Sequence, residues 1–312
     1  MFMAKSRKPI SLICYNHKGG VGKTFIASWL AYLFATGGVD KKGKKYRVVL
    51  VDLDSQQNSS KTFLEMQYRS GLPYLLPPLH PDYVDGDPDN GTWNGYSTSS
   101  DILFDRQFVY YPVKDVPNLK VLPSEGRVDR LNDVFSDRDA YIPLISELTE
   151  TYLEVEGDLD EVDIIIFDSP PSKTAITEGF MTKCSHVIIP TQLEYDSVEA
   201  VPNLLETIRI NNESTDEPIN VVGVIPNLVR SSSLTNSELE QFTNLIESVS
   251  RYEPVLNTSN LVPDDFFLVN RVIFKPRRKP DNLEEVFSLK KDVKATEEMT
   301  KLYKFVSERI GV

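Results

Sequence analysis

The sequence predicts an α/β fold, in which a twisted and mostly parallel sheet is flanked by helices. Short apolar runs rich in branched residues alternate with segments of helical periodicity, a pattern typical of parallel strands joined by crossover helices. The chain has 312 residues, of which 40% are hydrophobic, so it can bury a sizeable core. We therefore expect a single domain over residues 1–312.

The first expected strand, Ile10 to Tyr15, leads through a glycine-rich loop into a helix over about 23–35, which ends at a Gly-Gly pair. A second strand, Arg47 to Leu53, follows the basic turn KKGKK at 41–45. Later strands are expected at Leu119 to Leu122, Val162 to Phe167, His186 to Ile189, Asn220 to Ile225 and Leu268 to Phe274. Later helices are expected at about 140–154, 197–212, 236–249 and 293–310.

The segment over about 69–117 differs from the rest of the chain, because it contains seven prolines and four glycines with several aromatic residues between them. This composition excludes a regular helix or a central strand. A loop of this length is usually either disordered or functional. Its aromatic residues, which disordered segments tend to lack, keep a role in docking a partner open. We expect a Pro/Tyr-rich insertion on the surface of the domain.

The composition excludes several classes of protein. No run approaches the ~18 apolar residues of a membrane span, and the N-terminus has no apolar signal core. Two cysteines, Cys14 and Cys184, are too few for a disulfide framework or a four-cysteine metal site. A cytoplasmic location is therefore expected.

The net charge of −12 is unevenly distributed. Residues 1–47 carry ten Lys or Arg against one acid, residues 147–217 carry seventeen acids against three bases, and residues 271–304 carry ten bases against six acids. Such blocks are often only solvated surface. They also allow a local basic face on an acidic protein.

The sequence NHKGGVGKT, residues 16–24, lies between the first strand and the first helix, which is the context that a phosphate-binding loop requires. Glycines let the backbone wrap around phosphates, and N–H groups at a helix N-terminus point at the anion. Lys23 would reach the β and γ phosphates, and Thr24 would place its hydroxyl on Mg²⁺. His17 occupies the position where the general pattern has glycine.

With Lys18 in front, KGGVGKT resembles the deviant Walker A box of the ParA/MinD family of partitioning and positioning ATPases. VVLVDLDSQQNSS at 48–60 resembles the family's second motif, a strand ending in Asp-x-Asp-Pro-Gln, and DIIIFDSPPS at 163–172 resembles its Walker B strand. VIIPTQLEYDSVEAV at 187–201 resembles the strand that precedes a Gln-x-Glu and a helix. These motifs follow one another in order, and the resemblance is closest to the short ParA-type partition ATPases.

The resemblance implies roles for individual residues. Lys18 is similar to the signature lysine that crosses an ATP-sandwiched dimer to the partner's phosphates, and Asp54 would orient the attacking water. Lys18, Lys23 and Asp54 are thus the implied catalytic residues. Thr24, Asp52 and Asp168 are the implied Mg²⁺ site, in which the two carboxylates hold coordinated waters. The implied nucleotide-binding set is Lys18, Gly19, Gly20, Val21, Gly22, Lys23, Thr24 and Phe25, with Asn227 as a candidate adenine reader.

The chain departs from the family pattern at three positions. Phe25 follows Thr24 where the family usually has a second hydroxyl, Ser55 replaces a proline, and Gln57 replaces a usual glycine. None of these belongs to the implied catalytic set. They suggest a divergent branch.

The resemblance implies an ATPase that dimerises with ATP, binds nonspecific DNA, hydrolyses ATP to ADP and phosphate, and partitions or positions DNA or other cargo. It further implies a cargo-bound adaptor that stimulates hydrolysis and, with DNA bound, a location at the nucleoid. Phosphate contacts need no base-reading helix. The densest basic cluster available for them is Lys275, Arg277, Arg278 and Lys279.

Two alternatives remain open. A MinD-like protein would sit on membranes through a basic amphipathic C-terminal helix, but the mixed charges on the expected last helix favour packing on the sheet. The second alternative is a metabolic P-loop enzyme, such as a synthetase or an iron–sulfur reductase. In such a reductase the cysteines that bind the cluster would have to lie in loops, whereas Cys14 lies inside the first strand.

Overall fold

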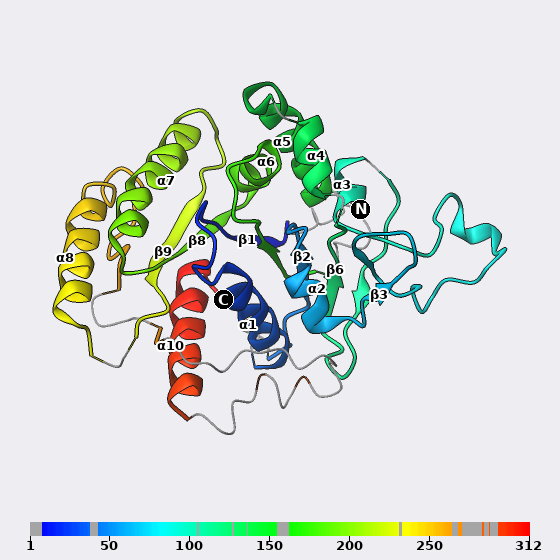
Figure 1. Ribbon diagram of the computed structural model, residues 1–312, viewed down its shortest axis with the longest axis horizontal. Coiled ribbons are helices and arrows are strands. Elements are labelled where there is room, and N and C mark those ends of the chain that lie inside the picture. The colour runs from blue at the N-terminus through cyan, green and yellow to red at the C-terminus, as the bar shows by residue number, and fades with distance from the viewer. Residues whose placement is uncertain are drawn as a thin grey trace, which may run out of the picture.

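The computed structural model describes residues 8–37, 43–104, 106–126, 128–135, 137–154, 162–230, 233–263, 268–269, 283, 287 and 293–312. Within these residues the main sheet has seven strands, in the order β5-β6-β2-β7-β1-β8-β9 (Figure 1). All neighbouring strands pair in parallel except β5, which is antiparallel to β6. The strands are β1 (Ile10–Cys14), β2 (Val48–Asp52), β5 (Tyr111–Pro112), β6 (Leu119–Leu122), β7 (Ile164–Asp168), β8 (His186–Thr191) and β9 (Asn220–Pro226).

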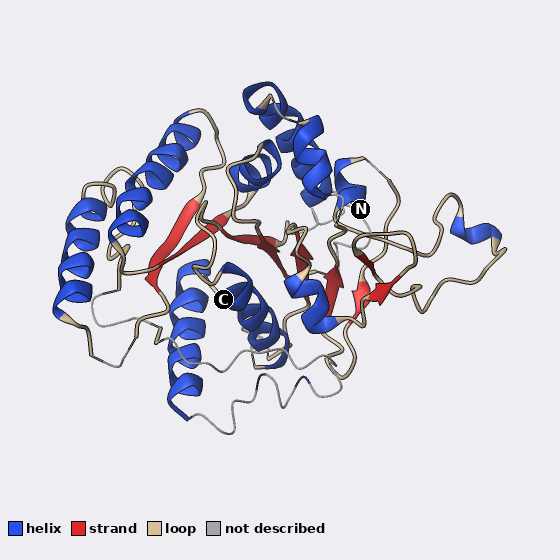
Figure 2. Ribbon diagram, viewed as in Figure 1, coloured by secondary structure: helices blue, strands red, loops and turns tan. Residues whose placement is uncertain are grey.

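Helices cover both faces of this sheet (Figure 2). One face carries α1 (Lys23–Thr36) and α10 (Val293–Ile310). The other carries α5 (Arg138–Glu154), α6 (Ala175–Lys183), α7 (Tyr195–Glu213) and α8 (Asn236–Ser250). The predicted fold class is therefore confirmed. The remaining described elements are α2 (Asn58–Phe63), α3 (Ser100–Leu103), α4 (Val128–Val134), the 3₁₀ turn η1 (Pro88–Asn90), and a separate hairpin of β3 (Gln67–Tyr68) and β4 (Leu75–Leu76).

The central strands are buried on both faces, which is why they read as continuous apolar runs in the sequence. Successive side chains along a strand point to opposite faces, so each strand supplies two cores. On β1, Leu12 joins the apolar cluster beneath α1 and α10, whereas Ile13 joins the cluster beneath α5 to α8. Because β6, β2, β7, β1, β8 and β9 run parallel, their carboxyl ends all lie at one edge of the sheet.

The last helix packs as the sequence predicted. In α10, Met299, Leu302, Val306 and Ile310 lie at helical spacing, and all four are buried in the cluster shared with α1. On the polar face of α10, Lys301, Lys304 and Glu308 are exposed. None of the described helices combines the length and the apolarity needed to cross a membrane.

The described part of the Pro/Tyr-rich segment forms β4, η1, α3 and β5, and it enters both apolar clusters, for example through Tyr110 and Tyr111. The ring of His80 packs against Tyr111 and Trp93, with centroids 4.9 and 5.3 Å apart. Pro112 lies on the edge strand β5, where a missing backbone donor is tolerated. The segment is therefore partly core and partly a projection at the β5 side of the sheet (Figure 1).

Of the expected strand Leu268 to Phe274, only 268–269 lies within the described residues, where Val269 forms a parallel bridge with Val229. The other confirmed elements agree with their expected bounds within a few residues.

Candidate nucleotide-binding site

The glycine loop joins the end of β1 to the start of α1, so it lies at the carboxyl edge of the sheet. Gly20 and Gly22 have φ angles of 76° and 94°, a conformation that residues with a Cβ rarely adopt. At Gly22 an added Cβ would lie 2.1 Å from Nδ2 of Asn227. The loop therefore requires glycine at this position for two separate reasons, and its backbone approaches its neighbours closely.

Amide side chains from neighbouring segments fix the shape of the loop. Asn16 donates to the carbonyl of Pro190 at 2.7 Å and accepts from the N–H of Lys18 at 2.9 Å. Asn227, which is 2% exposed, donates to the carbonyl of Val21 at 2.8 Å. Asn227 thus has a structural contact to the loop that the sequence did not predict. The ends of β8 and β9 hold the loop through these bonds.

Lys23 is buried at the start of α1, and its ammonium donates to the carbonyl of Lys18 at 2.9 Å. Burial lowers the pKa of Lys23 to about 8, although the carboxylates of Asp168 and Asp54 oppose this shift. The ammonium is therefore held inside the loop, where an anion would relieve the cost of its burial.

Lys18 lies at the surface, unlike Lys23. Its ammonium is 3.7 Å from a carboxylate oxygen of Asp196 in the first turn of α7, and the two side chains are 36% and 81% exposed. Ion pairs at such exposed positions typically contribute less than about 1 kcal/mol. The side chain of Lys18 is thus held only weakly by this contact.

Strand register brings two of the predicted carboxylates together. Asp52 and Asp168 are direct partners in the β2–β7 ladder, and both are fully buried. Asp52 accepts from the N–H and hydroxyl of Ser60 at 2.9 and 2.7 Å, and Asp168 accepts from the hydroxyl of Ser59 at 2.5 Å. Asp54 lies two residues further on and is 7% exposed.

The electrostatics of this pair favour a bound cation. Burial and the neighbouring Asp52 raise the pKa of Asp168 to about 8, against opposing hydrogen bonds from Ser59 and Thr24. Burial also raises the pKa of Asp52 to about 6. One oxygen of Asp168, Oδ1, is buried and accepts no hydrogen bond from the described residues. An acceptor left unsatisfied beside a second acid is a position that a cation or its bound water would fill.

The donor set fits Mg²⁺ in particular. Among the described residues, no group of three or more His, Cys, Asp or Glu is arranged to hold a metal ion directly. Mg²⁺ usually keeps several waters and is bound through one or two carboxylates together with substrate phosphates. The hydroxyl of Thr24, which is close enough to Asp168 to lower the pKa of that carboxyl group, adds a further oxygen donor beside the loop.

Phe25 and His17 each contact a neighbouring aromatic side chain. Phe25 packs on Trp29 with ring centroids 6.0 Å apart and so joins the core of α1. His17 lies within 3.3 Å of the hydroxyl of Tyr15. Burial, followed by the charge of Lys173, lowers the pKa of His17 to about 4, so this ring is neutral at physiological pH.

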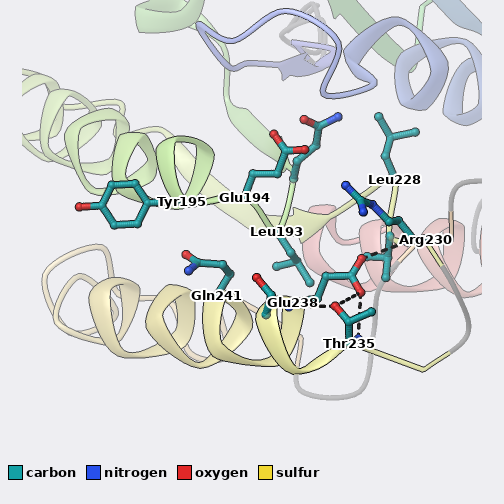
Figure 3. Close-up of a pocket in the computed structure, with 11 residues that line it drawn as sticks. Leu193, Glu194, Tyr195, Leu228, Arg230, Thr235, Glu238 and Gln241 are labelled. Atoms are coloured by element: carbon teal, nitrogen blue, oxygen red, sulfur yellow. Dashed lines mark hydrogen bonds between the residues drawn. The ribbon is translucent and has the colours of Figure 1, made fainter.

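A cavity of about 310 Å³ lies beside the loop (Figure 3). Its walls come from the segment after β8, the segment after β9 and the first turns of α8. Gln192, which lines it, also donates to the carbonyl of Gly20 at 3.4 Å. The sequence did not predict this cavity, because its lining comes from three distant segments: Gln192, Leu193, Glu194, Tyr195, Leu228, Val229, Arg230, Thr235, Ser237, Glu238 and Gln241.

The predicted DNA-binding residues Lys275, Arg277, Arg278 and Lys279 lie outside the described residues. Of the basic turn at 41–45, Lys44 and Lys45 are described, and both are exposed.

A glycine loop at the carboxyl edge of a parallel sheet, with a buried lysine and two paired acidic strand ends, defines a P-loop nucleoside-triphosphate-binding protein. The model of the family described as "AAA domain" matches residues 8–221, and the chain belongs to this family. The chain is 28% identical over 243 residues to the sporulation initiation inhibitor protein Soj of Bacillus subtilis, in a match that covers 76% of this chain and 77% of Soj. The resemblance to ParA-type partition ATPases is thereby confirmed.

Two solved structures have the same fold. The ATP complex of a McdA variant from Cyanothece superposes with a TM-score of 0.65 at 16% identity, over 98% of this chain and 97% of McdA. The pNOB8 ParA bound to nonspecific DNA superposes with a TM-score of 0.58 at 18% identity, over 97% of this chain and 99% of that one. At these identities the likeness concerns the fold alone.

Proposed function

We propose that the protein is a dimerising ATPase of the ParA type, which binds nonspecific DNA as an ATP dimer and partitions or positions DNA or other cargo. The observation that carries this proposal is the separation of two lysines in one loop. Lys23 is buried within the site, whereas Lys18 lies at the surface with only an exposed partner. A lysine in that position is suited to reach the phosphates of a second subunit.

In this proposal, residues 18–25 hold the phosphates of ATP. Lys23 neutralises charge on the β and γ phosphates, and bound Mg²⁺ supplies further neutralisation of the charge that develops during phosphoryl transfer. Thr24 offers its hydroxyl, and Asp52 and Asp168 hold the coordinated waters. Because the pKa of Asp168 is raised to about 8, a bound cation would compete with the proton of this carboxyl group at neutral pH.

Asp54 orients the attacking water in this proposal, and hydrolysis yields ADP and phosphate. Asp54 follows Asp52 by two residues and is 7% exposed, whereas Asp52 is fully buried. We further propose that the adenine enters the cavity beside the loop, with Asn227, the neighbour of the lining residue Leu228, as the adenine reader. This placement of the adenine is supported by Gln192, which lines the cavity and also donates a hydrogen bond to Gly20 of the loop.

The proposed DNA contacts are Lys275, Arg277, Arg278 and Lys279, doubled by dimerisation. We also propose that residues 1–312 form a single domain, that the protein is cytoplasmic and associates with the nucleoid, and that a cargo-bound adaptor stimulates hydrolysis. The MinD-like alternative loses support, because the apolar stripe of α10 is buried against α1 and the sheet.

Fluorescence anisotropy tests this function on two unrelated duplexes at several salt concentrations, with ATP and with ADP. Neutralising ~4–8 phosphates per dimer gives a slope of log K against log salt of roughly −4 to −7, and ADP should flatten it. Changing Arg277 and Arg278 together to Glu should weaken binding to both duplexes equally while basal ATP turnover stays near normal. Equal and negligible binding in both nucleotide states would exclude the DNA-carrier function.

A further inference from the structure

Gln57 has an unusual backbone conformation for its residue type. Among the described non-glycine residues with positive φ, three are Asn or Asp, which tolerate this region, and the others are Gln57 and Leu228. Gln57 has a φ of 58°, is 2% exposed, and immediately precedes α2. It also stands where the ParA/MinD pattern usually has glycine. Some interaction of this side chain must offset the unfavourable conformation.

The side-chain amide of Gln57 provides that interaction. Its nitrogen donates to the carbonyl of Leu75 at 2.8 Å and to the carbonyl of Ser124 at 2.9 Å. Leu75 belongs to β4 of the separate hairpin, and Ser124 follows the end of β6. An amide nitrogen carries two protons, so both are used. Gln57 therefore joins three segments that are distant in sequence.

The same residue closes the turn that carries Asp54. The N–H of Gln57 donates to the carbonyl of Asp54 at 2.9 Å, and the N–H of Gln56 donates to a carboxylate oxygen of Asp54 at 2.9 Å. Ser124 connects to the second carboxylate as well, because its N–H donates to Ser60, whose hydroxyl donates to Asp52 at 2.7 Å. A movement of the hairpin or of the segment after β6 would therefore shift both Asp54 and Asp52.

We propose that Gln57 is a positioning residue, which sets the position of Asp54 for hydrolysis and couples the nucleotide site to the β3–β4 hairpin. This inference rests on the proposed ATPase function. Coupling of this kind is reciprocal, so nucleotide binding must also stabilise the hairpin. The hairpin is accessible, since Tyr68 on β3 is 74% exposed, and a ligand that moves it would change the rate of hydrolysis.

Gln57→Gly tests the proposal directly, because glycine keeps the backbone conformation and removes both hydrogen bonds. We expect the affinity for a non-hydrolysable Mg·ATP analogue to stay within about threefold, while kcat, measured with DNA present, falls by about 10- to 100-fold, the cost of a displaced catalytic group. Glu65→Gly is the control, because residue 65 is exposed in the segment between α2 and β3, and the same glycine enters there without removing either hydrogen bond of Gln57. Its kcat should stay within about twofold of the wild type.

Hydrogen exchange of residues 67–76 tests the coupling. In the wild type the analogue should slow exchange there, and in Gln57→Gly this protection should be absent. Unchanged exchange in the wild type would overturn the coupling. A normal kcat for Gln57→Gly would overturn the positioning role, whereas a wild type without hydrolysis would instead refute the proposed function.

If the Gln57→Gly variant does not fold, Gln57→Glu tests the positioning role of residue 57 instead. The ionised carboxyl would face two carbonyl oxygens without a proton, whereas its protonated form would restore one bond. The kcat of this variant, relative to the wild type, should therefore rise as the pH falls. A ratio independent of pH would contradict the role of these hydrogen bonds.

Discussion

Asp168 combines full burial with an unsatisfied oxygen, and its ionisation should therefore affect the stability of the free protein. The folded pKa of about 8 exceeds the ordinary value of 3.8, so the unfolded chain releases this proton first. Stability consequently falls as the pH rises from about 4 to 8. Asp168→Asn should raise the melting temperature at pH 8 and have a much smaller effect near pH 4.

Asp163→Asn is a control for which the change in melting temperature should have the opposite sign. Asp163 lies immediately before the same strand, β7. Although partial burial raises the pKa of Asp163, the hydrogen bonds and charge of Arg47 outweigh it and lower the pKa. Its ionised form therefore stabilises the fold above pH 4, and Asp163→Asn should lower the melting temperature at neutral pH. Scanning calorimetry of both variants from pH 4 to 8 measures this; parallel curves would contradict the assignment for Asp168.

Gly22→Ala should destabilise the protein more than Gly20→Ala does. Both changes place a Cβ at positive φ, at a cost of about 1–2 kcal/mol. Only at Gly22 does the Cβ also collide with Asn227 and displace its hydrogen bond to Val21, which adds about 1–3 kcal/mol. Urea denaturation of the nucleotide-free variants measures the difference. Equal free energies of unfolding would show that the collision with Asn227 is easily relieved.

The sequence predicted which residues belong to the site better than it predicted which side chains they contact. The loop and its acids follow strands that are evident from their apolar runs. The pairing of Asp52 with Asp168 depends on register between strands more than a hundred residues apart, which no local pattern encodes. The same holds for the Lys18–Asp196 contact and for the bonds of Gln57.

At the scale of elements, α10 stabilises the face of the sheet that also supports the loop through α1. Leu302 is fully buried there, so Leu302→Ala should lower the free energy of unfolding by about 2–5 kcal/mol. Lys301→Ala, one residue earlier and exposed, should change it by less than about 0.5 kcal/mol. Urea denaturation monitored by circular dichroism distinguishes the two. Similar values would mean that the helix packs loosely.

Long strands and long helices were predictable, and short or interrupted elements were not. α2 and α3 contain six and four residues, which is too short to display helical periodicity. In α6 the sequence has Gly179 in mid-helix, a residue that weakens helix propensity. The structure explains it, since a Cβ there would lie 2.5 Å from Ile145 of α5. Close helix packing, which is a tertiary requirement, overrode the local preference.

At the scale of the whole molecule, the proposed dimer depends on the exposed lysine of the loop. Lys18→Ala should bind Mg·ATP with affinity near that of the wild type but fail to dimerise, because the substitution removes an interaction that forms only across the proposed interface. Asp54→Ala should bind ATP and accumulate as a dimer, since this change affects only the positioning of water. Light scattering with ATP compares these variants. An ATP dimer formed by Lys18→Ala would exclude the role in the partner's site.

The two cysteines occupy opposite apolar clusters: Cys14 lies beneath α1 and α10, and Cys184 lies beneath α5 to α8. Both thiols are buried, and burial raises the pKa of each, so neither reacts with alkylating reagents while its cluster stays closed. Mass spectrometry after timed alkylation therefore reports, as zero, one or two adducts per molecule, how many of the two clusters have opened. A population with one adduct would reveal that the faces open separately. If two adducts arrive together, the sheet and both helical layers unfold as one cooperative unit.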